Sequence, residues 1–116
     1  QGGSKHYKAK QLQVQLKAMD DQRETLKRSL ELQAINLTDN MIKALEKMES
    51  GKKAMSQAEK ALTISQKMYE VGAGTYLDVT NAELGYIQAG LSYNQSIFDF
   101  MSAKADLEKL LGKAIE

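Results

Sequence analysis

A turn segment between residues 69 and 79 constrains the fold more than any other part of the sequence, because it joins a helix stop directly to a helix start. Gly72 lacks a Cβ atom, so it can adopt the left-handed conformation that closes a helix at little cost. Gly74 follows two residues later and keeps the connection short. We therefore predict a hairpin turn at residues 72–74, with helices on both sides.

The second helix has a clear start signal. Thr75 and Asp78 have the spacing of a capping box, in which each side chain accepts a hydrogen bond from the backbone N–H of the other. A negative side chain in the first turn also suits the positive end of the helix dipole. We expect this return helix to cover residues 75–112.

Before the turn, no residue forces the chain out of a helix, since the sequence contains no proline. Ser4 follows a glycine pair and can cap a helix that begins at Lys5, so we expect the first helix to cover residues 5–71. The fold class predicted is all-α, a long antiparallel coiled-coil hairpin in a single unit of residues 1–116. The alternative is a break near Asn36 or Gly51 that gives a compact three-helix bundle.

The first helix carries one stripe of apolar or small residues at alternating spacings of three and four, which is typical of a coiled-coil seam. Arg23 interrupts its first part, and a single extra four-residue step occurs between Leu30 and Ala34, where we expect a local change of supercoil. The seam consists of Leu12, Leu16, Met19, Leu26, Leu30, Ala34, Leu37, Met41, Ala44, Met48, Gly51, Met55, Ala58, Leu62, Ser65 and Tyr69.

The return helix carries two such seams, which we call the inner and the outer seam. They are offset by two residues, or about 200° around a helix, so they lie on nearly opposite sides. We therefore expect neighbours on both flanks of this helix. The inner seam is Val79, Ala82, Tyr86, Ala89, Tyr93, Ser96, Phe100, Ala103, Leu107 and Leu110, and the outer seam is Leu77, Thr80, Leu84, Ile87, Leu91, Asn94, Phe98, Met101 and Ala105.

The two helices differ in length. At about 1.5 Å per residue the first would be about 100 Å long and the second about 55 Å. Residues 5–33 therefore have no partner within the chain, although they carry an apolar seam. We expect this part either to associate with another chain, including a further copy of the same chain, or to fray.

Composition argues against several classes of function. The net charge is only +1, with +4 on residues 1–70 and −3 on residues 71–116, and the basic residues alternate with acids, so we expect no nucleic-acid partner. There is no cysteine, one histidine, and no nucleophile–base pair or metal-ligand spacing, so we expect no enzyme, no catalytic or metal-binding residue and no cofactor. No apolar run reaches the roughly 20 residues that cross a bilayer, so this chain is not expected to span a membrane directly.

The turn and the helix that follows it resemble those of outer-membrane efflux proteins of the TolC type. The resemblance is carried by Tyr69-Glu70-Val71-Gly72-Ala73-Gly74-Thr75-Tyr76-Leu77-Asp78-Val79-Thr80-Asn81-Ala82, with further support from Ala103-Lys104-Ala105-Asp106-Leu107-Glu108-Lys109-Leu110-Leu111-Gly112. The family's pattern is a tyrosine, a glycine three residues later, and an aspartate-valine pair that opens a helix. The resemblance implies a fragment of the C-terminal repeat, from the periplasmic part of a Gram-negative outer-membrane protein.

This family resemblance also implies a function. Such proteins are homotrimers whose long helices form a periplasmic tunnel, a passive exit duct for small molecules in a tripartite efflux pump. The tip that meets the periplasmic adaptor, or membrane fusion, protein would be Val71, Gly72, Ala73, Gly74 and Thr75. The gate at the pore entrance would involve Tyr69, Asp78 and Asn81, with Asp78 in an acidic ring.

A second class of function is a structural or adaptor-type coiled-coil hairpin without a lumen. A two-stranded hairpin of that kind needs only one seam on the return helix, whereas a tunnel wall needs lateral neighbours on both sides. The two opposed seams favour the tunnel wall.

Overall fold

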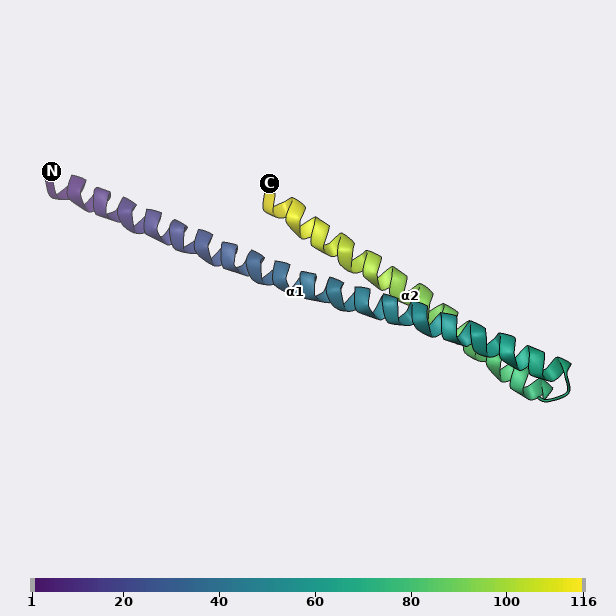
Figure 1. Cartoon of the computed structure of the whole chain (residues 1–116). Coiled ribbons are helices and arrows are strands. Elements are labelled where there is room, and N and C mark those ends of the chain that lie inside the picture. The colour runs from purple at the N-terminus through teal and green to yellow at the C-terminus, as the bar shows by residue number, and fades with distance from the viewer. Residues whose placement is uncertain (1, 116) are drawn as a thin grey trace.

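The computed structural model describes residues 2–115 and consists of two antiparallel helices, α1 (Gly2–Glu70) and α2 (Tyr76–Ile115), joined by a five-residue connection (Figure 1). Within the described residues there is no strand. The molecule is a rod of 105 × 18 × 14 Å. The predicted all-α antiparallel hairpin is confirmed.

The helix ends differ from the predicted ones by one to three residues. α1 begins at Gly2, so Ser4 lies inside the helix and does not cap it, and α1 ends at Glu70. α2 begins at Tyr76 and continues past Gly112 to Ile115. Glycine lowers helix propensity by only about 1 kcal/mol per residue, which local helix formation can offset. Residues 1–4 were expected to precede the helix as a connector, and of these Gln1 lies outside the described residues.

The alternative of a broken first helix is wrong. α1 is continuous through Asn36 and Gly51, and Figure 1 shows one long rod in place of a three-helix bundle. The polar stretch near Asn36 is accommodated in part because the Thr38 hydroxyl donates to the Ala34 carbonyl, 2.7 Å away and one turn earlier. This bond satisfies the hydroxyl group inside the helix.

The core of the hairpin is the contact between the seam of α1 and the inner seam of α2. Every seam residue of α1 from Ala34 to Ser65 is at least partly buried, as is every residue of the inner seam, whereas Tyr69 at the end of the α1 seam is 48% exposed. Gly51 lies against Tyr93 and Ser96, and Gly90 lies near Met55. Counting from the Gly51–Tyr93 contact places Ala34 level with Leu110 and Ser65 level with Val79.

The packing is tight at one point. Ser96 has the most deeply buried side chain among residues 2–115, at 2% exposure, and its hydroxyl donates to the Tyr93 carbonyl at 2.6 Å. Its Oγ lies only 3.5 Å from the place where a Cβ on Gly51 would be. Small residues on both helices therefore allow a close approach here.

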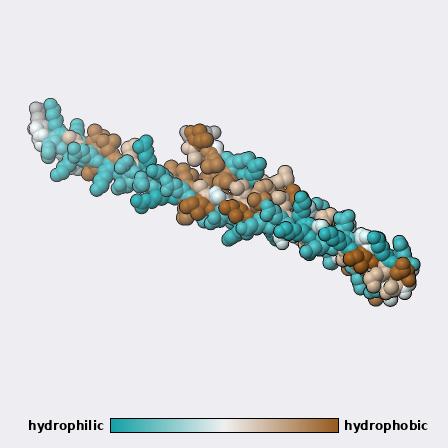
Figure 2. All heavy atoms as spheres, in the orientation of Figure 1, coloured by the Kyte–Doolittle hydropathy of each residue, from teal (hydrophilic) through white to brown (hydrophobic). Residues whose placement is uncertain are grey.

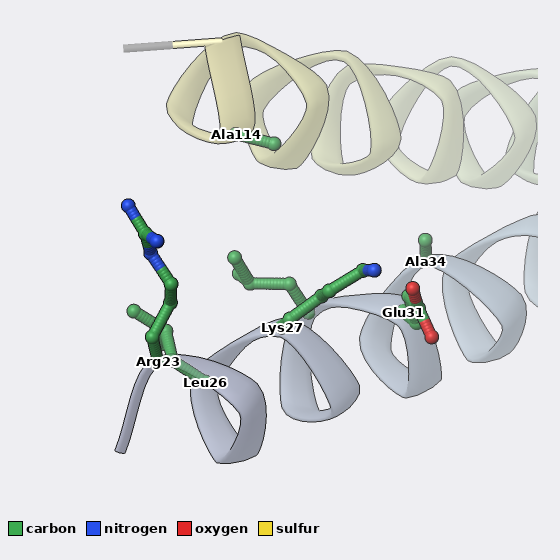
Figure 3. Close-up of a pocket in the computed structure, with 7 residues that line it drawn as sticks. Arg23, Leu26, Lys27, Glu31, Ala34 and Ala114 are labelled. Atoms are coloured by element: carbon green, nitrogen blue, oxygen red, sulfur yellow. The ribbon is translucent and has the colours of Figure 1, made fainter. Parts of the chain in front are cut away.

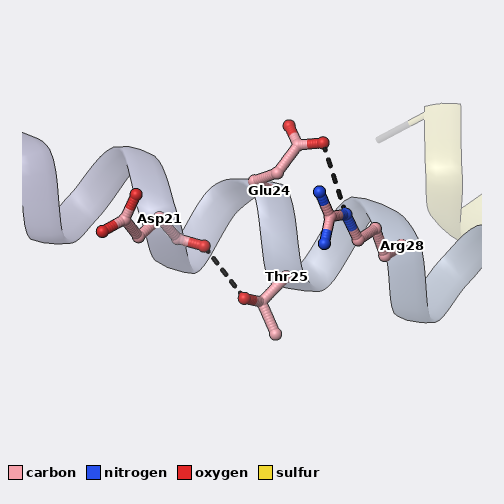
Figure 4. Close-up of polar contacts among 4 residues, drawn as sticks. All are labelled: Asp21, Glu24, Thr25 and Arg28. Atoms are coloured by element: carbon pink, nitrogen blue, oxygen red, sulfur yellow. Dashed lines mark hydrogen bonds and ion pairs between the residues drawn. The ribbon is translucent and has the colours of Figure 1, made fainter.

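A region of α1 that we call the overhang, residues 2–28, extends beyond the end of α2 (Figure 1). Its seam residues Leu12, Leu16, Met19 and Leu26 are all exposed. The N-terminal part of α1 thus has no partner within the chain, as predicted, but this part ends at residue 28 and not at residue 33, because α2 continues to Ile115. Exposed local contacts support this part of the helix: the Thr25 hydroxyl donates to the Asp21 carbonyl at 3.0 Å, and Glu24 pairs with Arg28 at 3.7 Å (Figure 4).

A pair of glycine substitutions tests the chain reversal. Gly72 has a φ of +77°, and a residue with a Cβ there costs roughly 1 to 2 kcal/mol. Gly85 lies within α2 with open space around its Cα, so alanine there adds up to about 1 kcal/mol of helix stability. We expect Gly72→Ala to lower the free energy of unfolding in urea and Gly85→Ala to raise it. Changes of the same sign would contradict the assignment of Gly72 as the helix stop.

Substitutions of Ser96 test the close approach of the two helices. Ser96→Leu places three more carbon atoms against the Gly51 backbone, and overpacking of this kind costs typically about 1 to 3 kcal/mol. Ser96→Ala removes only a hydroxyl whose acceptor lies in the same helix, so we expect a loss below about 1 kcal/mol. Thermal unfolding of both variants measures the difference. Equal effects would show that the helices can separate at this position without cost.

Candidate functional site

The connection between the helices is closed by hydrogen bonds to the last turn of α1. The Met68 carbonyl accepts from the N–H groups of Ala73 and Gly74, at 2.8 and 3.1 Å. Gly72 has the left-handed conformation that this arrangement requires. A Cβ on Gly74 would lie 3.3 Å from the Cβ of Met68, so the connection is pressed against the end of α1. The tip is therefore a compact structure without a long loop.

The start of α2 has the predicted capping box. The Thr75 N–H donates to the Asp78 carboxylate at 3.0 Å, and the Asp78 N–H donates to the Thr75 hydroxyl oxygen at 3.1 Å. The hydrogen bond that the Asp78 carboxylate accepts from the Thr75 backbone, and secondly the hydrogen bonding with the Thr75 side chain, hold the pKa of Asp78 below its ordinary value of 3.8. Asp78 therefore carries its negative charge at neutral pH.

The three predicted gate residues separate into two groups. Asp78 and Asn81 lie together in a shallow hollow at the tip, which is also lined by Ser65, Met68 and Gly74. Tyr69 is not part of this hollow. Its ring instead meets the ring of Tyr76 edge to face, with centroids 5.8 Å apart and an interplanar angle of 62°.

The contact between the two tyrosines was not predicted from the sequence. Tyr69 is the last but one residue of α1 and Tyr76 is the first residue of α2, so the pair links the two sides of the connection. The only signal in the sequence was their position just outside the turn. Aromatic pairs with this geometry contribute about 0.5 to 1.5 kcal/mol beyond the area they bury, so the contact stabilises the chain reversal.

The tip presents apolar side chains to the outside. Val71 is 78% exposed, and Tyr76 and Leu77 are exposed as well. Figure 2 shows apolar atoms gathered at the end of the rod that holds the connection. An exposed apolar tip on a closed turn is suited to contact with another protein.

The outer seam of α2 is exposed along its whole length. Its large residues all remain more than half exposed: Leu77, Leu84, Ile87, Leu91, Phe98 and Met101. The inner seam is covered by α1, so α2 has a neighbour on one flank only. The second flank is an apolar surface for which the described chain supplies no cover.

Two further features are absent from the described residues. Residues 2–115 contain no group of three or more histidine, cysteine, aspartate or glutamate side chains that could hold a metal ion. The same range contains no helix that meets the length and hydropathy needed to cross a membrane. Its two ion pairs, Glu24–Arg28 and Lys104–Glu108, each lie within one helix.

Comparison of the chain with models of protein families, with curated proteins and with solved structures found no match. The structure itself defines the class of the molecule as an extended antiparallel α-helical hairpin with a coiled-coil seam.

The capping box predicts a pH dependence of stability. Since folding lowers the pKa of Asp78, the carboxylate contributes fully to stability above its unfolded pKa, and this contribution is lost as the pH falls through the lower folded value. In Asp78→Asn the amide oxygen can still accept from Thr75, but it does not titrate. We expect the parent to be more stable than Asp78→Asn at pH 6 and this advantage to shrink below pH 3.8. Thermal unfolding across this range is the measurement, and an advantage that grew with acidity would contradict the capping role.

Proposed function

We propose that this hairpin is a wall segment of the periplasmic tunnel of a trimeric outer-membrane efflux channel of the TolC type. The tunnel would be a passive exit duct for small molecules in a tripartite pump. The observation that carries the proposal is the pair of opposed seams on α2, one covered by α1 and the other exposed.

The exposed outer seam favours a wall over an isolated hairpin. It runs from Leu77 to Ala105, a length of about 42 Å at 1.5 Å per residue. An adaptor-type hairpin without a lumen would present charged residues on this face, because only one seam would be needed. Lateral neighbours in a tunnel would remove the apolar side chains from water along their full length.

The tip is proposed as the contact with the adaptor. Its residues, from Val71 to Thr75, are held by the hydrogen bonds to Met68 and by the capping box, so they offer a surface of defined shape. Such a surface loses little conformational entropy on binding. Displacement of this connection by the adaptor would be transmitted to both helix ends, where Tyr69 and Tyr76 meet.

The entrance of the duct is proposed at Asp78 and Asn81, which share the hollow at the tip. Threefold repetition of Asp78 would place three negative charges around the pore, and such rings attract cations and resist anions. The lowered pKa keeps these carboxylates charged across the physiological pH range. Tyr69 would hold the entrance closed through its contact with the neighbouring helix start.

Single-channel recording tests the role of Asp78 in the full-length trimer. We expect Asp78→Asn to reduce cation preference and block by multivalent cations, because it removes the charge and keeps the size of the side chain. Since salt reduces the Debye length to about 8 Å at physiological strength, the difference between parent and variant should diminish as salt increases.

The matched control is Asp106→Asn, the same change on the same helix far from the tip, which should leave selectivity unaltered. Unchanged selectivity in both variants would assign Asp78 to helix capping only.

A further inference from the structure

Two apolar surfaces in the described part of the chain lack cover, and they have matching spacing. The overhang carries Leu12, Leu16, Met19, Arg23 and Leu26, at steps of four, three, four and three residues. The outer seam of α2, followed backwards, carries Leu91, Ile87, Leu84, Thr80 and Leu77, at the same steps. In each set four members are apolar and exposed, and the fourth position is polar.

From this match we infer that a second copy of the chain is the partner of these surfaces. The overhang of one copy packs against the outer seam of the next copy, antiparallel to its α2. The layers are Leu12 with Leu91, Leu16 with Ile87, Met19 with Leu84, Arg23 with Thr80, and Leu26 with Leu77. The inference concerns the chain by itself, outside the proposed duct, in which lateral neighbours would cover the outer seam.

The direction of packing is decided by Arg23. Two seams that run parallel form regular knobs-into-holes layers only if their spacings of three and four residues occur in the same order along both helices. In the two parallel alignments that cover the overhang seam, Arg23 faces Leu91 or Phe98. Burying a guanidinium group against an apolar side chain without a hydrogen-bond partner is costly, so parallel packing is disfavoured.

The antiparallel register is decided by the part of the α1 seam that α2 of the same copy leaves uncovered. Arg23 can face a polar residue in two registers, opposite Thr80 or opposite Asn94. In the Asn94 register, α2 of the neighbouring copy would lie beside residues of α1 beyond Leu30. That part of the seam is already covered by α2 of the first copy. The Thr80 register avoids this overlap, because the neighbour's α2 begins level with Lys27, where the copy's own α2 ends.

The Thr80 layer can accept the charge of Arg23. The Thr80 hydroxyl donates to the Tyr76 carbonyl at 3.0 Å, which leaves the lone pairs of its oxygen free to accept from a guanidinium group. Glu83 lies one turn further along α2 on the neighbouring surface. Arg23 therefore meets both an acceptor and a negative charge.

A groove at the end of α2 receives the tip of the next copy. It is lined by Arg23, Leu26, Lys27, Leu30, Glu31, Ala34 and Ala114, and Figure 3 shows Arg23 extending from α1 on the side where α2 lies. In the proposed register Leu77 packs on Leu26 at this groove, and Tyr76 lies beside it. The exposed apolar residues at the tip and the apolar floor of the groove would thus cover each other.

Net charge also favours this partner. Residues 5–27 carry six basic and three acidic side chains, whereas residues 77–98 carry two acidic and no basic ones. Unlike charges on the two surfaces promote encounter between copies. Because the two surfaces differ, the contact is heterologous, and each copy offers one surface of each kind. The copies therefore associate head to tail, with a displacement of about 60 Å along the rod.

Sedimentation velocity of the chain and three variants tests the inference. We expect the parent to form species above the mass of 12.9 kDa that grow with concentration. Leu16→Glu and Ile87→Glu each place a charge in one of the two seams and should weaken association by at least about tenfold. Val14→Glu is the matched control, since Val14 is 65% exposed on the overhang but lies off the seam, and this variant should associate like the parent.

A mixture of the two seam variants gives a sharper result. Leu16→Glu retains an intact outer seam and Ile87→Glu retains an intact overhang, so an equal mixture should form a dimer of about twice 12.9 kDa and nothing larger. A parent that stays monomeric up to millimolar concentration would overturn the inference. So would association of Leu16→Glu at the strength of the parent, because outer seams would then pair with each other.

Disulfide trapping tests the register, since the chain has no cysteine of its own. Leu16→Cys mixed with Ile87→Cys should cross-link on mild oxidation, because facing seam positions lie within the usual Cα separation of a disulfide. Leu16→Cys mixed with Met101→Cys reports the excluded Asn94 register and should not cross-link. The reverse pattern would overturn the proposed register, and the efficiency of either pair is independent of channel selectivity.

Discussion

The reversal of the chain at Gly72 determines which residues of α1 and α2 can meet. Because the connection has only five residues and is tied to the Met68 carbonyl, neither helix can slide along the other. The register set at the tip then carries through to the Gly51–Tyr93 contact and on to Leu110, near the end of α2. A longer connection would allow neighbouring registers, since no ion pair joins the two helices in the described part of the chain.

Most of this architecture could be predicted from the sequence because burial in a long helical pair repeats along the chain. The seam from Ala34 to Ser65 and the inner seam of α2 are at least partly covered throughout, and the capping box of Thr75 and Asp78 forms as its spacing predicts. Seam spacing and capping patterns predict this structure well because the packing of each pair of facing residues depends only on the adjacent pairs. The helix ends at Gly2 and Ile115 were not predicted, because glycine permits a helix that no stronger signal stops.

Prediction of the candidate site was less complete for a physical reason. Asp78 and Asn81 share a hollow because they lie one turn apart on one helix, which spacing alone indicates. The contact of Tyr69 with Tyr76 depends on the path of the connection, which no periodic pattern describes. The exposed outer seam does not specify which partner covers it, because the proposed duct neighbour and the proposed second copy would occupy the same face. Assembly into a duct would therefore exclude head-to-tail association.

The thinness of the rod has a mechanical consequence. Each layer of the hairpin contacts only the layers before and after it, so the pair behaves as a linear zipper with one closed end. The free energy needed to separate the two helices is lowest at the Leu110 end, where no connection joins them. It is highest near Gly72. A force that pulls the N-terminal end of α1 away from the C-terminal end of α2 would separate the helices one layer after another. The tyrosine pair at the turn would be among the last contacts to break. The molecule would yield gradually from its open end while its tip kept its shape.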